Sequence, residues 1–259
     1  MYIIDAFAEK QFKGNPAAVV PLGEWLSVEL MQAIAIENNL SETAFFVRNQ
    51  KGVFDIRWFS PISEVDFCGH ATLASAYVIF KTSPELNQIS FWAKAVGTIV
   101  VKKMNDGLIE MCFPNREPVA IQDIPLPLKD GLSIQPNSYL KNQQAYFAIY
   151  ESEEQIKQVS PNVEKLKTLA PFDVVVSAPG EKYDFVSRYF WPSNGGVEDP
   201  VTGSIHAGLA PYWAKVLKKN ELVALQASTR TGILYCRVEQ NHVYISGNCV
   251  NYLEGIISI

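Results

Sequence analysis

The chain has 259 residues, of which 48% are hydrophobic and 12% aromatic, enough for one large or two ordinary packed domains. Its net charge of −5, without a long run of lysine or arginine, disfavours nucleic acid and anionic membranes as main partners. The four cysteines form no Cys-x-x-Cys pair, the three histidines lie far apart and no nucleotide-binding glycine pattern is present, so we expect no metal and no cofactor.

The first predicted elements follow directly from the amino terminus. Residues 2–8 are typical of a strand, and a turn at Asn15-Pro16 leads into a second strand. Apolar residues recur at helical spacing over 26–37, with Ser27 as the predicted cap, which indicates an outer helix. Because the chain enters this strand without a leader-like segment, we expect a cytoplasmic protein.

A strand over 42–47 raises the question of where Glu42 points. In a strand, Glu42 lies on the same face as Ala44 and Phe46. If that face is buried, desolvation raises the affinity of Glu42 for a proton and suits it as a general base. Alternation alone favours the opposite arrangement, in which Glu42 is a solvated acid.

The remaining elements describe a mostly antiparallel sheet protein. A hairpin turn is predicted at Asn105-Asp106-Gly107, and the proline-rich segment 114–127 is predicted to link two halves. A charged helix is expected within 152–169. Strands are predicted over 53–59, 89–92, 97–102, 108–113, 145–150, 174–177, 183–191, 222–226, 233–239, 242–246 and 250–259.

The stretch 195–207 gathers acid, hydroxyl and imidazole groups on a turn that opens a helix. Gly195 and Gly196 loosen the backbone, and a helix starting near Ser204 would point unpaired N–H groups at the turn, a favourable anion site. Pro211 is predicted to kink or end this helix. The alternative is that this stretch is an ordinary loop with glycine and Asp-Pro turn residues, followed by a serine that only caps the helix.

A second copy of the pattern favours the functional interpretation. Residues 57–61 and 188–192 both read Arg, aromatic, Phe, any residue, Pro, and each is followed by an acidic turn and an uncharged apolar helix. Gly69 and Gly203 are 134 positions apart (203 − 69), about half of the chain. This predicts two similar domains. If they face each other, two helix N-termini converge on a cleft suited to a small carboxylate.

With these motifs in place, the sequence resembles the PhzF-like family of phenazine biosynthesis proteins. The resemblance is supported at 187–188 and 210–214 and covers nearly the full chain. Its main motifs are Asp5-Ala6-Phe7, Phe12-Lys13-Gly14-Asn15-Pro16-Ala17-Ala18-Val19, Ser41-Glu42-Thr43-Ala44-Phe45, Cys68-Gly69-His70-Ala71-Thr72 and Glu198-Asp199-Pro200-Val201-Thr202-Gly203-Ser204.

The resemblance implies an α+β, diaminopimelate-epimerase-like fold. In this fold two pseudo-symmetric domains each form a mainly antiparallel β-barrel around a central α-helix. The predicted domains are 1–116 with 250–259, and 117–249. A homodimer is also implied.

The resemblance further implies roles for individual residues, and it moves Glu42 into the cleft. The implied catalytic residues are Glu42, His70 and Asp199, and the implied substrate-binding residues are Asn15, Ser41, Gly69, Gly203 and Ser204. Related epimerases use one cysteine on each helix turn. Here only the first turn has one, Cys68, so we expect no two-thiol racemisation and a small buried role for Cys68.

Three functions follow as hypotheses. The leading one is a cofactor-independent isomerase that moves a proton between carbons of a small unsaturated amino or hydroxy acid, with Glu42 as acid and base. The family's reference substrate is trans-2,3-dihydro-3-hydroxyanthranilate. The alternatives are a small-acid binding or sequestering protein without turnover, and a hydrolase using Ser204, His206 and Asp199. Residues two apart on a helix do not face each other, which disfavours the hydrolase.

Overall fold

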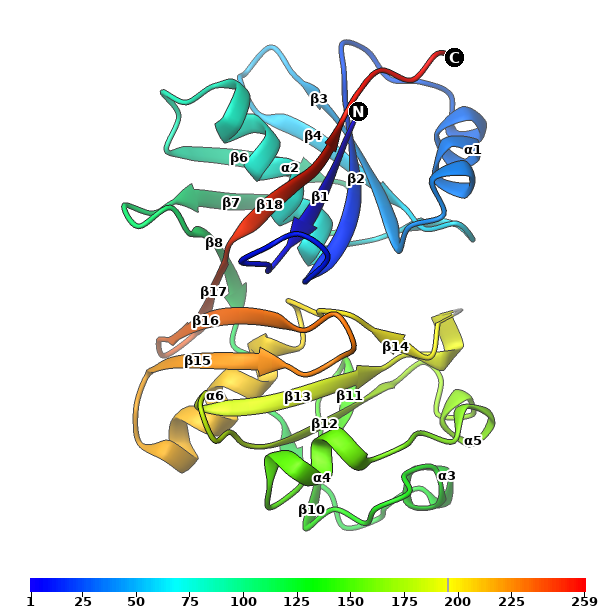
Figure 1. Ribbon diagram of the computed structural model, residues 1–259, viewed down its shortest axis with the longest axis vertical. Coiled ribbons are helices and arrows are strands. Elements are labelled where there is room, and N and C mark those ends of the chain that lie inside the picture. Colours follow the sequence, from blue (N-terminus) through cyan, green and yellow to red (C-terminus); the bar gives the residue numbers. More distant parts are fainter. Residues whose placement is uncertain (195) are drawn as a thin grey trace. The chain divides into compact units, whose positions relative to one another are not determined.

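The computed structural model describes residues 1–194 and 196–259, which divide into two compact units (Figure 1). The first unit comprises Met1–Cys112 and Ser246–Ile259, and the second comprises Phe113–Ile245. The predicted flexibility at Gly195 lies outside the described residues. Among these residues, no helix is both long enough and apolar enough to cross a membrane.

The first unit is a sheet built around one buried helix. Its strands pair antiparallel, except that β2 pairs parallel with β3 and β4 parallel with β6, where a helix makes the connection. The elements are β1 (Tyr2–Ala6), β2 (Asn15–Leu22), α1 (Val28–Asn38), β3 (Glu42–Arg48), β4 (Phe54–Phe59), β5 (Glu64–Val65), α2 (Gly69–Thr82), β6 (Gln88–Ala93), β7 (Gly97–Lys103), β8 (Ile109–Pro114) and β18 (Cys249–Glu254).

The second unit repeats this plan. Parallel pairs again occur where helices connect strands, between β11 and β12 and between β13 and β15. The elements are β9 (Val119–Ala120), α3 (Leu126–Asp130), β10 (Ser138–Lys141), β11 (Ala145–Ile149), α4 (Glu153–Gln158), α5 (Val163–Lys167), β12 (Asp173–Pro179), β13 (Phe185–Phe190), the 3₁₀ turn η1 (Pro192–Asn194), β14 (Glu198–Asp199), α6 (His206–Leu217), β15 (Glu221–Gln226), β16 (Gly232–Val238) and β17 (His242–Gly247).

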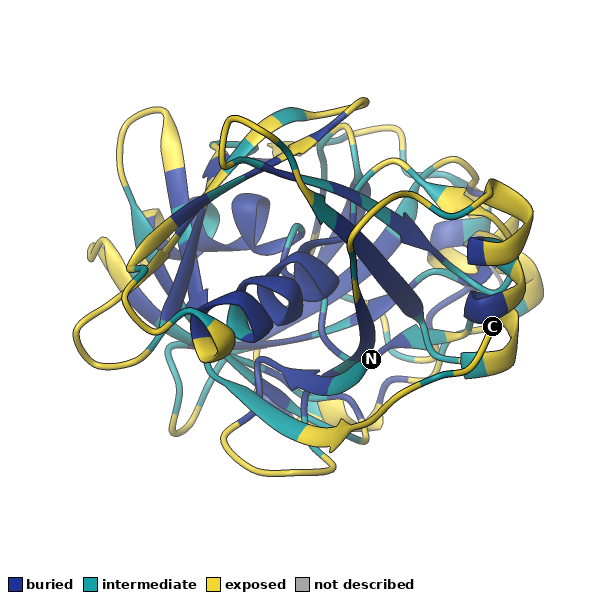
Figure 2. Ribbon diagram, turned by 90° about the horizontal axis from the view of Figure 1, so that it is seen from above, coloured by how far each residue is buried: buried dark blue, intermediate teal, exposed yellow. Residues whose placement is uncertain are grey.

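Each unit buries one uncharged helix. Helix α2 is buried from Gly69 to Phe80 apart from Tyr77, and it contacts strands on several sides (Figure 2). Helix α6 is buried over most of its first two turns and contacts β15 and β16. The two helices lack charged side chains until Lys81 and Lys215, so both can be surrounded by apolar strands without burying a charge.

The strand registers extend the repeat to single residues. Phe45 pairs with Arg57 in the first unit, and Val176 pairs with Arg188 in the second. Counting back along β3 and β12 by three residues makes Glu42 and Asp173 equivalent, again 131 apart (173 − 42 and 188 − 57). The offset of 134 positions that relates Gly69 to Gly203 likewise makes His70 equivalent to Ser204 (204 − 70).

Several details differ from the predicted elements. Helix α6 begins at His206 rather than near Ser204, because residues 203–205 form a tighter turn in which His206 N–H donates to Gly203 O. The helix also continues through Pro211. Proline removes one helical N–H, and the N–H of Arg116 replaces it by donating to Ala207 O at 3.0 Å.

The predicted charged helix within 152–169 is two short helices. Pro161 interrupts the segment, and Asn162 then caps α5 by accepting from Lys165 N–H. The predicted linker 114–127 also contains the short strand β9 and the start of α3. The closing strand 250–259 ends at Glu254 and pairs with β1. The predicted cap of α1 is confirmed, because Ser27 Oγ accepts from Leu30 N–H.

Candidate active site

Glu42 is buried at the start of β3. Only 5% of the residue is exposed, and its neighbours Thr43, Ala44 and Phe45 are buried as well. Both faces of the strand are therefore covered, which is why alternation could not place Glu42. The structure corrects the solvated alternative and places Glu42 inside the first unit.

His70 lies beside Glu42. It is the second residue of α2, is 5% exposed, and its Nε2 is 3.2 Å from Oε2 of Glu42. Burial lowers the pKa of His70 to about 3, so the imidazole is neutral at pH 7. The contact is therefore a short polar contact between a neutral ring and a carboxyl oxygen rather than an ion pair.

Asn15 and Ser41 determine which ring nitrogen of His70 carries the proton. Ser41 Oγ donates to Asn15 Oδ1 at 3.4 Å, which turns the Asn15 amide nitrogen toward His70 Nδ1 at 3.2 Å. Since Nδ1 accepts this hydrogen bond, the proton of the neutral ring is on Nε2, the nitrogen that lies 3.2 Å from Glu42 Oε2. Ser41, Asn15 and His70 thus form one hydrogen-bonded chain, and Glu42 is in polar contact with its end.

Cys68 completes the first turn. It precedes α2 as its N-cap residue without a side-chain capping bond, it is buried, and its Sγ is 3.4 Å from His70 Nδ1. Ligand atoms of Glu42, Cys68 and His70 lie within 4.8 Å of one another, so this trio has the donor types that a soft divalent cation would use. Gly69, the first residue of α2, is buried between Cys68 and His70.

The second unit holds Asp199 in a braced turn. Asp199 lies on β14 and is buried, and its Oδ2 accepts a hydrogen bond from the hydroxyl of Thr202. Gln226 ties this turn to β15, because its Oε1 accepts from Thr202 N–H and its Nε2 donates to Asp199 O, both at 2.9 Å. Ser228 Oγ donates to Pro200 O at 2.7 Å. The backbone around Asp199 is thus held by side chains from another strand.

Ser204 belongs to a second network that sequence reasoning missed. Gln144 Nε2 donates to Ser204 Oγ at 2.9 Å and to the hydroxyl of Tyr189 at 3.2 Å. Tyr189 in turn donates to Asp173 Oδ2 at 2.7 Å, and burial raises the Tyr189 pKa well above 10, which keeps this hydroxyl protonated. Asp173 could have been found only by transferring Glu42 through the repeat, which requires the strand registers.

His206 has a structural role. Its Nδ1 donates to Thr202 O at 2.9 Å, and its ring is fully buried beside Phe185. Ser204 Oγ accepts from Gln144 instead. The serine and histidine do not form a nucleophile–base pair, and the prediction of a packed core histidine is confirmed. Gly203 is buried in the turn between Thr202 and Ser204.

Thr231 adopts an uncommon backbone conformation in the turn before β16. Its φ of 59° lies in the left-handed region. Glycine reaches this region without steric cost, whereas a β-branched residue does not. The turn at 228–231 therefore has a backbone shape suited to glycine.

The match to known proteins extends over both units. A family model described as phenazine biosynthesis-like protein matches residues 4–255, including the turns of Glu42, His70 and Asp199. The chain belongs to the phenazine biosynthesis-like family.

Individual members of this family are similar to the chain along its whole length. An uncharacterized isomerase of Pseudomonas aeruginosa is 43% identical over 261 residues, with 100% of this chain and 98% of the relative covered. The crystal structure of a PhzF family protein from Enterococcus faecalis matches with a TM-score of 0.94 and 41% identity, covering 100% of this chain and 98% of the other.

More distant structures share only the fold. A probable proline racemase from Agrobacterium radiobacter matches with a TM-score of 0.63 at 10% identity, covering 100% of this chain and 92% of the other. Together with the PhzF family structure, it confirms the α+β fold class that the motifs predicted.

Proposed function

We propose that this protein is a cofactor-independent isomerase that moves a proton between carbons of a small unsaturated amino or hydroxy acid. The isomerase class itself follows from family membership and from relatives of 41 to 43% identity that are named as isomerases. The substrate class, the absence of a cofactor and the residue roles are the proposal. A cytoplasmic location belongs to the same proposal.

The observation that carries the proposal is the buried contact of 3.2 Å between His70 Nε2 and Glu42 Oε2. In the proposed reaction, Glu42 takes a proton from a carbon next to the unsaturated system of the substrate. The electron pair of the broken C–H bond moves into that system, and Glu42, whose carboxyl proton exchanges with solvent, then delivers a proton to another carbon. One bond to hydrogen breaks and one forms, so the step needs no external oxidant or reductant.

His70 supports this role through its neutral state. A neutral imidazole 3.2 Å from the carboxyl group favours one orientation of that group without adding a positive charge that would disfavour its protonated form. The chain from Ser41 through Asn15 keeps the donor on Nε2. Glu42 can therefore alternate between base and acid beside an unchanged partner.

In the second unit, Asp199 is the proposed catalytic partner that hydrogen-bonds the substrate, and Ser204 is a proposed substrate-binding group. Asp199 is held by Thr202, and Ser204 accepts from Gln144, which leaves its own hydroxyl hydrogen to be donated to a substrate carboxylate. Gly69 and Gly203 keep the start of each turn small. A sequestering protein would need the binding groups without the Glu42–His70 pair.

Proton exchange in D₂O tests the proposal without assuming a product. Candidate acids, beginning with trans-2,3-dihydro-3-hydroxyanthranilate, are incubated with the protein and followed by proton NMR. We expect deuterium at a carbon position, at a rate that falls about 10²- to 10⁴-fold in a Glu42→Gln variant because the acid and base is removed.

Glu110→Gln is the matched control. Glu110 is a similarly buried glutamate of the first unit, on β8, with no proposed role. Its variant should exchange at the native rate. Equal loss in both variants would mean that Glu42 serves folding only, and ligand binding without exchange across a broad panel would favour the sequestering protein.

A further inference from the structure

Three side chains that can ligate a metal meet where β3 and α2 begin. Glu42 is the first residue of β3, Cys68 is the N-cap residue of α2, and His70 is the second residue of that helix. One ligand atom from each lies within 4.8 Å of the other two, and all three residues are buried. The proposed reaction uses Glu42 and His70 and leaves the thiol without a part.

Spacing along the chain could not reveal this cluster. Glu42 and Cys68 are 26 positions apart (68 − 42), and they meet through the packing of α2 on β3. The sequence-based expectation of no metal considered only cysteine and histidine residues that are close together in sequence. The cluster is therefore a property of the folded first unit.

The distances within the cluster suit a tetrahedral cation. Nε2 of His70 is 3.2 Å from Oε2 of Glu42 and 4.0 Å from Sγ of Cys68. Bonds of about 2.0 to 2.3 Å from one zinc ion place two of its ligands about 3.3 to 3.6 Å apart. Both separations lie within about 0.4 Å of this range, which small side-chain rotations can supply.

The donor types and charges select zinc among the common divalent cations. Thiolate, imidazole and carboxylate are its ligands in proteins, whereas calcium and magnesium prefer oxygen ligands throughout. A zinc ion with the Cys68 thiolate, the Glu42 carboxylate and a neutral imidazole has no net charge, which suits a buried site. The thiol proton passes to solvent when the zinc–sulfur bond forms. Cys68 also lies where the dipole of α2 favours a negative sulfur.

Asn15 and Ser41 can support the zinc-bound histidine. In the structure, Nδ1 of His70 accepts from the Asn15 amide at 3.2 Å, whereas zinc on Nε2 requires the ring proton on Nδ1. Turning the Asn15 amide by half a turn presents its oxygen to that proton. The Ser41 hydroxyl, 3.4 Å from Asn15 Oδ1, then rotates to accept from the amide nitrogen. A carbonyl group behind a zinc-bound histidine is a common supporting partner.

The internal repeat gives the second unit no such site. The offset of 134 makes Cys68 equivalent to Thr202 (68 + 134), and Asp173 and Ser204 are the equivalents of Glu42 and His70. These three residues supply oxygen atoms only. Zinc prefers sites that include sulfur or nitrogen, so the repeat predicts one zinc ion per chain.

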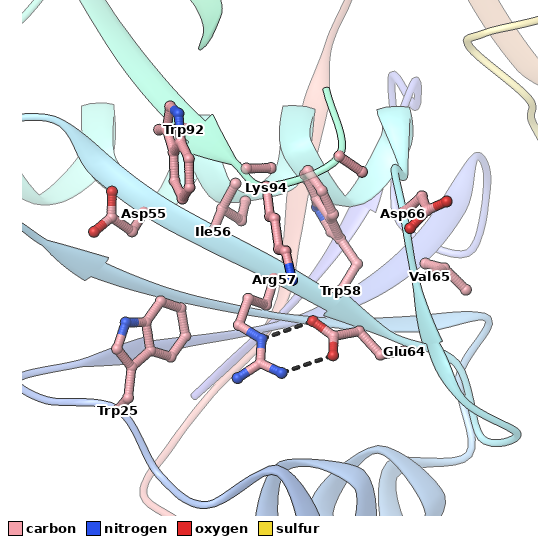
Figure 3. A pocket seen from close by; sticks show the side chains of 12 residues that line it. Trp25, Asp55, Ile56, Arg57, Trp58, Glu64, Val65, Asp66, Trp92 and Lys94 are labelled. Carbon is pink, nitrogen blue, oxygen red and sulfur yellow. Dashed lines mark hydrogen bonds and ion pairs between the residues drawn. The ribbon is translucent and has the colours of Figure 1, made fainter. Parts of the chain in front are cut away.

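Figure 3 shows a second gathering of charged side chains in the first unit, a groove lined by Asp55, Glu64 and Asp66. Among the described residues that line this groove, none is a cysteine or a histidine. Both carboxylate oxygens of Glu64 accept hydrogen bonds from Arg57 at 2.6 Å, as the dashed lines mark. The groove therefore lacks the sulfur and nitrogen donors that the cluster around Cys68 provides.

We propose that Glu42, Cys68 and His70 form an inhibitory zinc site. One Zn²⁺ is bound by Sγ of Cys68, Nε2 of His70 and a carboxylate oxygen of Glu42, and a water molecule completes the tetrahedron. The ion occupies the carboxylate that would accept the substrate proton, so the isomerase is inactive while zinc is bound. Zinc binding does not depend on the proton transfer, and only the inhibition rests on the proposed function.

Cobalt titration of the full chain tests this assignment, because Co²⁺ takes the same ligands and reports them in its absorption spectrum. The native protein should bind one Co²⁺ per chain, with the visible bands of a tetrahedral ion and a near-ultraviolet cobalt–sulfur band, and Zn²⁺ should displace it. Cys68→Ser should lose the sulfur band and bind Zn²⁺ at least about 100-fold more weakly, since losing a supporting group alone costs about 10- to 100-fold. Cys112→Ser, which removes an exposed thiol from β8, is the control.

Glu42→Gln tests the site independently of the thiol. This variant keeps the shape of the side chain, so it should keep the cobalt–sulfur band. It should bind Zn²⁺ at least about 10-fold more weakly, because a neutral amide is a poorer zinc ligand than a carboxylate. Circular dichroism and thermal unfolding of all three variants show whether the fold is retained.

Each outcome decides the matter. A sulfur band that is lost in Cys68→Ser and kept in Cys112→Ser supports the site. Absence of this band from the native protein, or equal Zn²⁺ affinity in Cys68→Ser and Cys112→Ser, overturns it. Deuterium exchange that continues when Zn²⁺ saturates the site overturns the inhibitory role. Cobalt binding involves no turnover, so a lack of exchange with every acid would contradict the isomerase reaction and not the site.

Discussion

At the scale of residues, the polar network around Glu42 in the first unit and the one around Asp173 in the second unit differ in their hydrogen-bond partners. In the first unit, Asn15 donates to His70, whose other ring nitrogen lies 3.2 Å from Glu42. In the second unit, the group equivalent to Glu42 is Asp173, which accepts from Tyr189 rather than from the residue equivalent to His70. The first arrangement suits a proton-transferring carboxyl group, and the second one orients a serine hydroxyl.

Gln144 is therefore expected to act on substrate affinity. Replacing Gln144 by Leu removes the donor to Ser204, so the hydroxyl hydrogen is no longer directed outward. We expect KM for the substrate found by exchange to rise about 10-fold, equivalent to about 1.4 kcal/mol, while kcat changes little. Steady-state kinetics of Gln144→Leu beside Gln240→Leu, a surface control, checks this. A loss confined to kcat would contradict it.

At the scale of elements, one tight backbone position, Gly14, holds the first strands in register. Gly14 precedes β2 with a φ of +67°, and a Cβ atom there would lie 2.1 Å from Ala6 O. Gly23 follows the same strand, and a Cβ atom there meets nothing within 4 Å. The motif that contains Asn15 thus depends on a glycine for its geometry, because Asn15 pairs with Ala6 across the two strands.

This contrast gives a matched pair of variants. Gly14→Ala should lower the free energy of unfolding by at least about 2 kcal/mol, since it adds both a clash and an unfavourable backbone conformation. Gly23→Ala should change it by no more than about 0.5 kcal/mol. Urea unfolding of both variants measures the difference. Similar stabilities would show that the strand end relaxes around the added methyl group.

At the scale of the whole molecule, each unit buries a neutral histidine at the start of its central helix. Burial lowers the pKa of His70 to about 3 and that of His206 to about 4, from an ordinary value of 6.5. Between those values the unfolded chain holds more protons than the folded one. Stability is therefore complete above pH 6.5 and falls as the pH is lowered through this window.

A His206→Phe variant isolates one of these contributions. The native protein should lose about 1.4 kcal/mol of stability per pH unit from His206 between pH 6.5 and 4, and the variant should lack this slope. Above pH 6.5 the two should differ by a constant amount, which reflects the lost bond to Thr202. Urea unfolding across pH 4 to 8 measures both. Parallel curves throughout would show that His206 is protonated in the folded state.

Local chemistry was sufficient to predict much of this molecule. Apolar periodicity, turn residues and the repeated motif at Arg57 and Arg188 predicted most strands and the two uncharged helices, because these depend on neighbours along the chain. The α+β class followed from the family resemblance. The predicted start of α6 near Ser204 was wrong, because residues 203–205 form a tight turn. The helix continues through Pro211 because the N–H of Arg116 supplies the missing hydrogen bond. The interruption of the predicted helix at Pro161 was missed.

Only the tertiary structure decided how the polar groups meet. Alternation could not place Glu42, because β3 is buried on both faces. The networks of Gln144, Tyr189 and Gln226 join strands that are far apart in sequence, and their register has no local signal. The equivalent ion pairs of Arg57 with Glu64 and of Arg188 with Glu198 differ in exposure, with 29% and 15% of the arginine side chain exposed, because burial is a property of packed elements rather than of any short stretch of sequence.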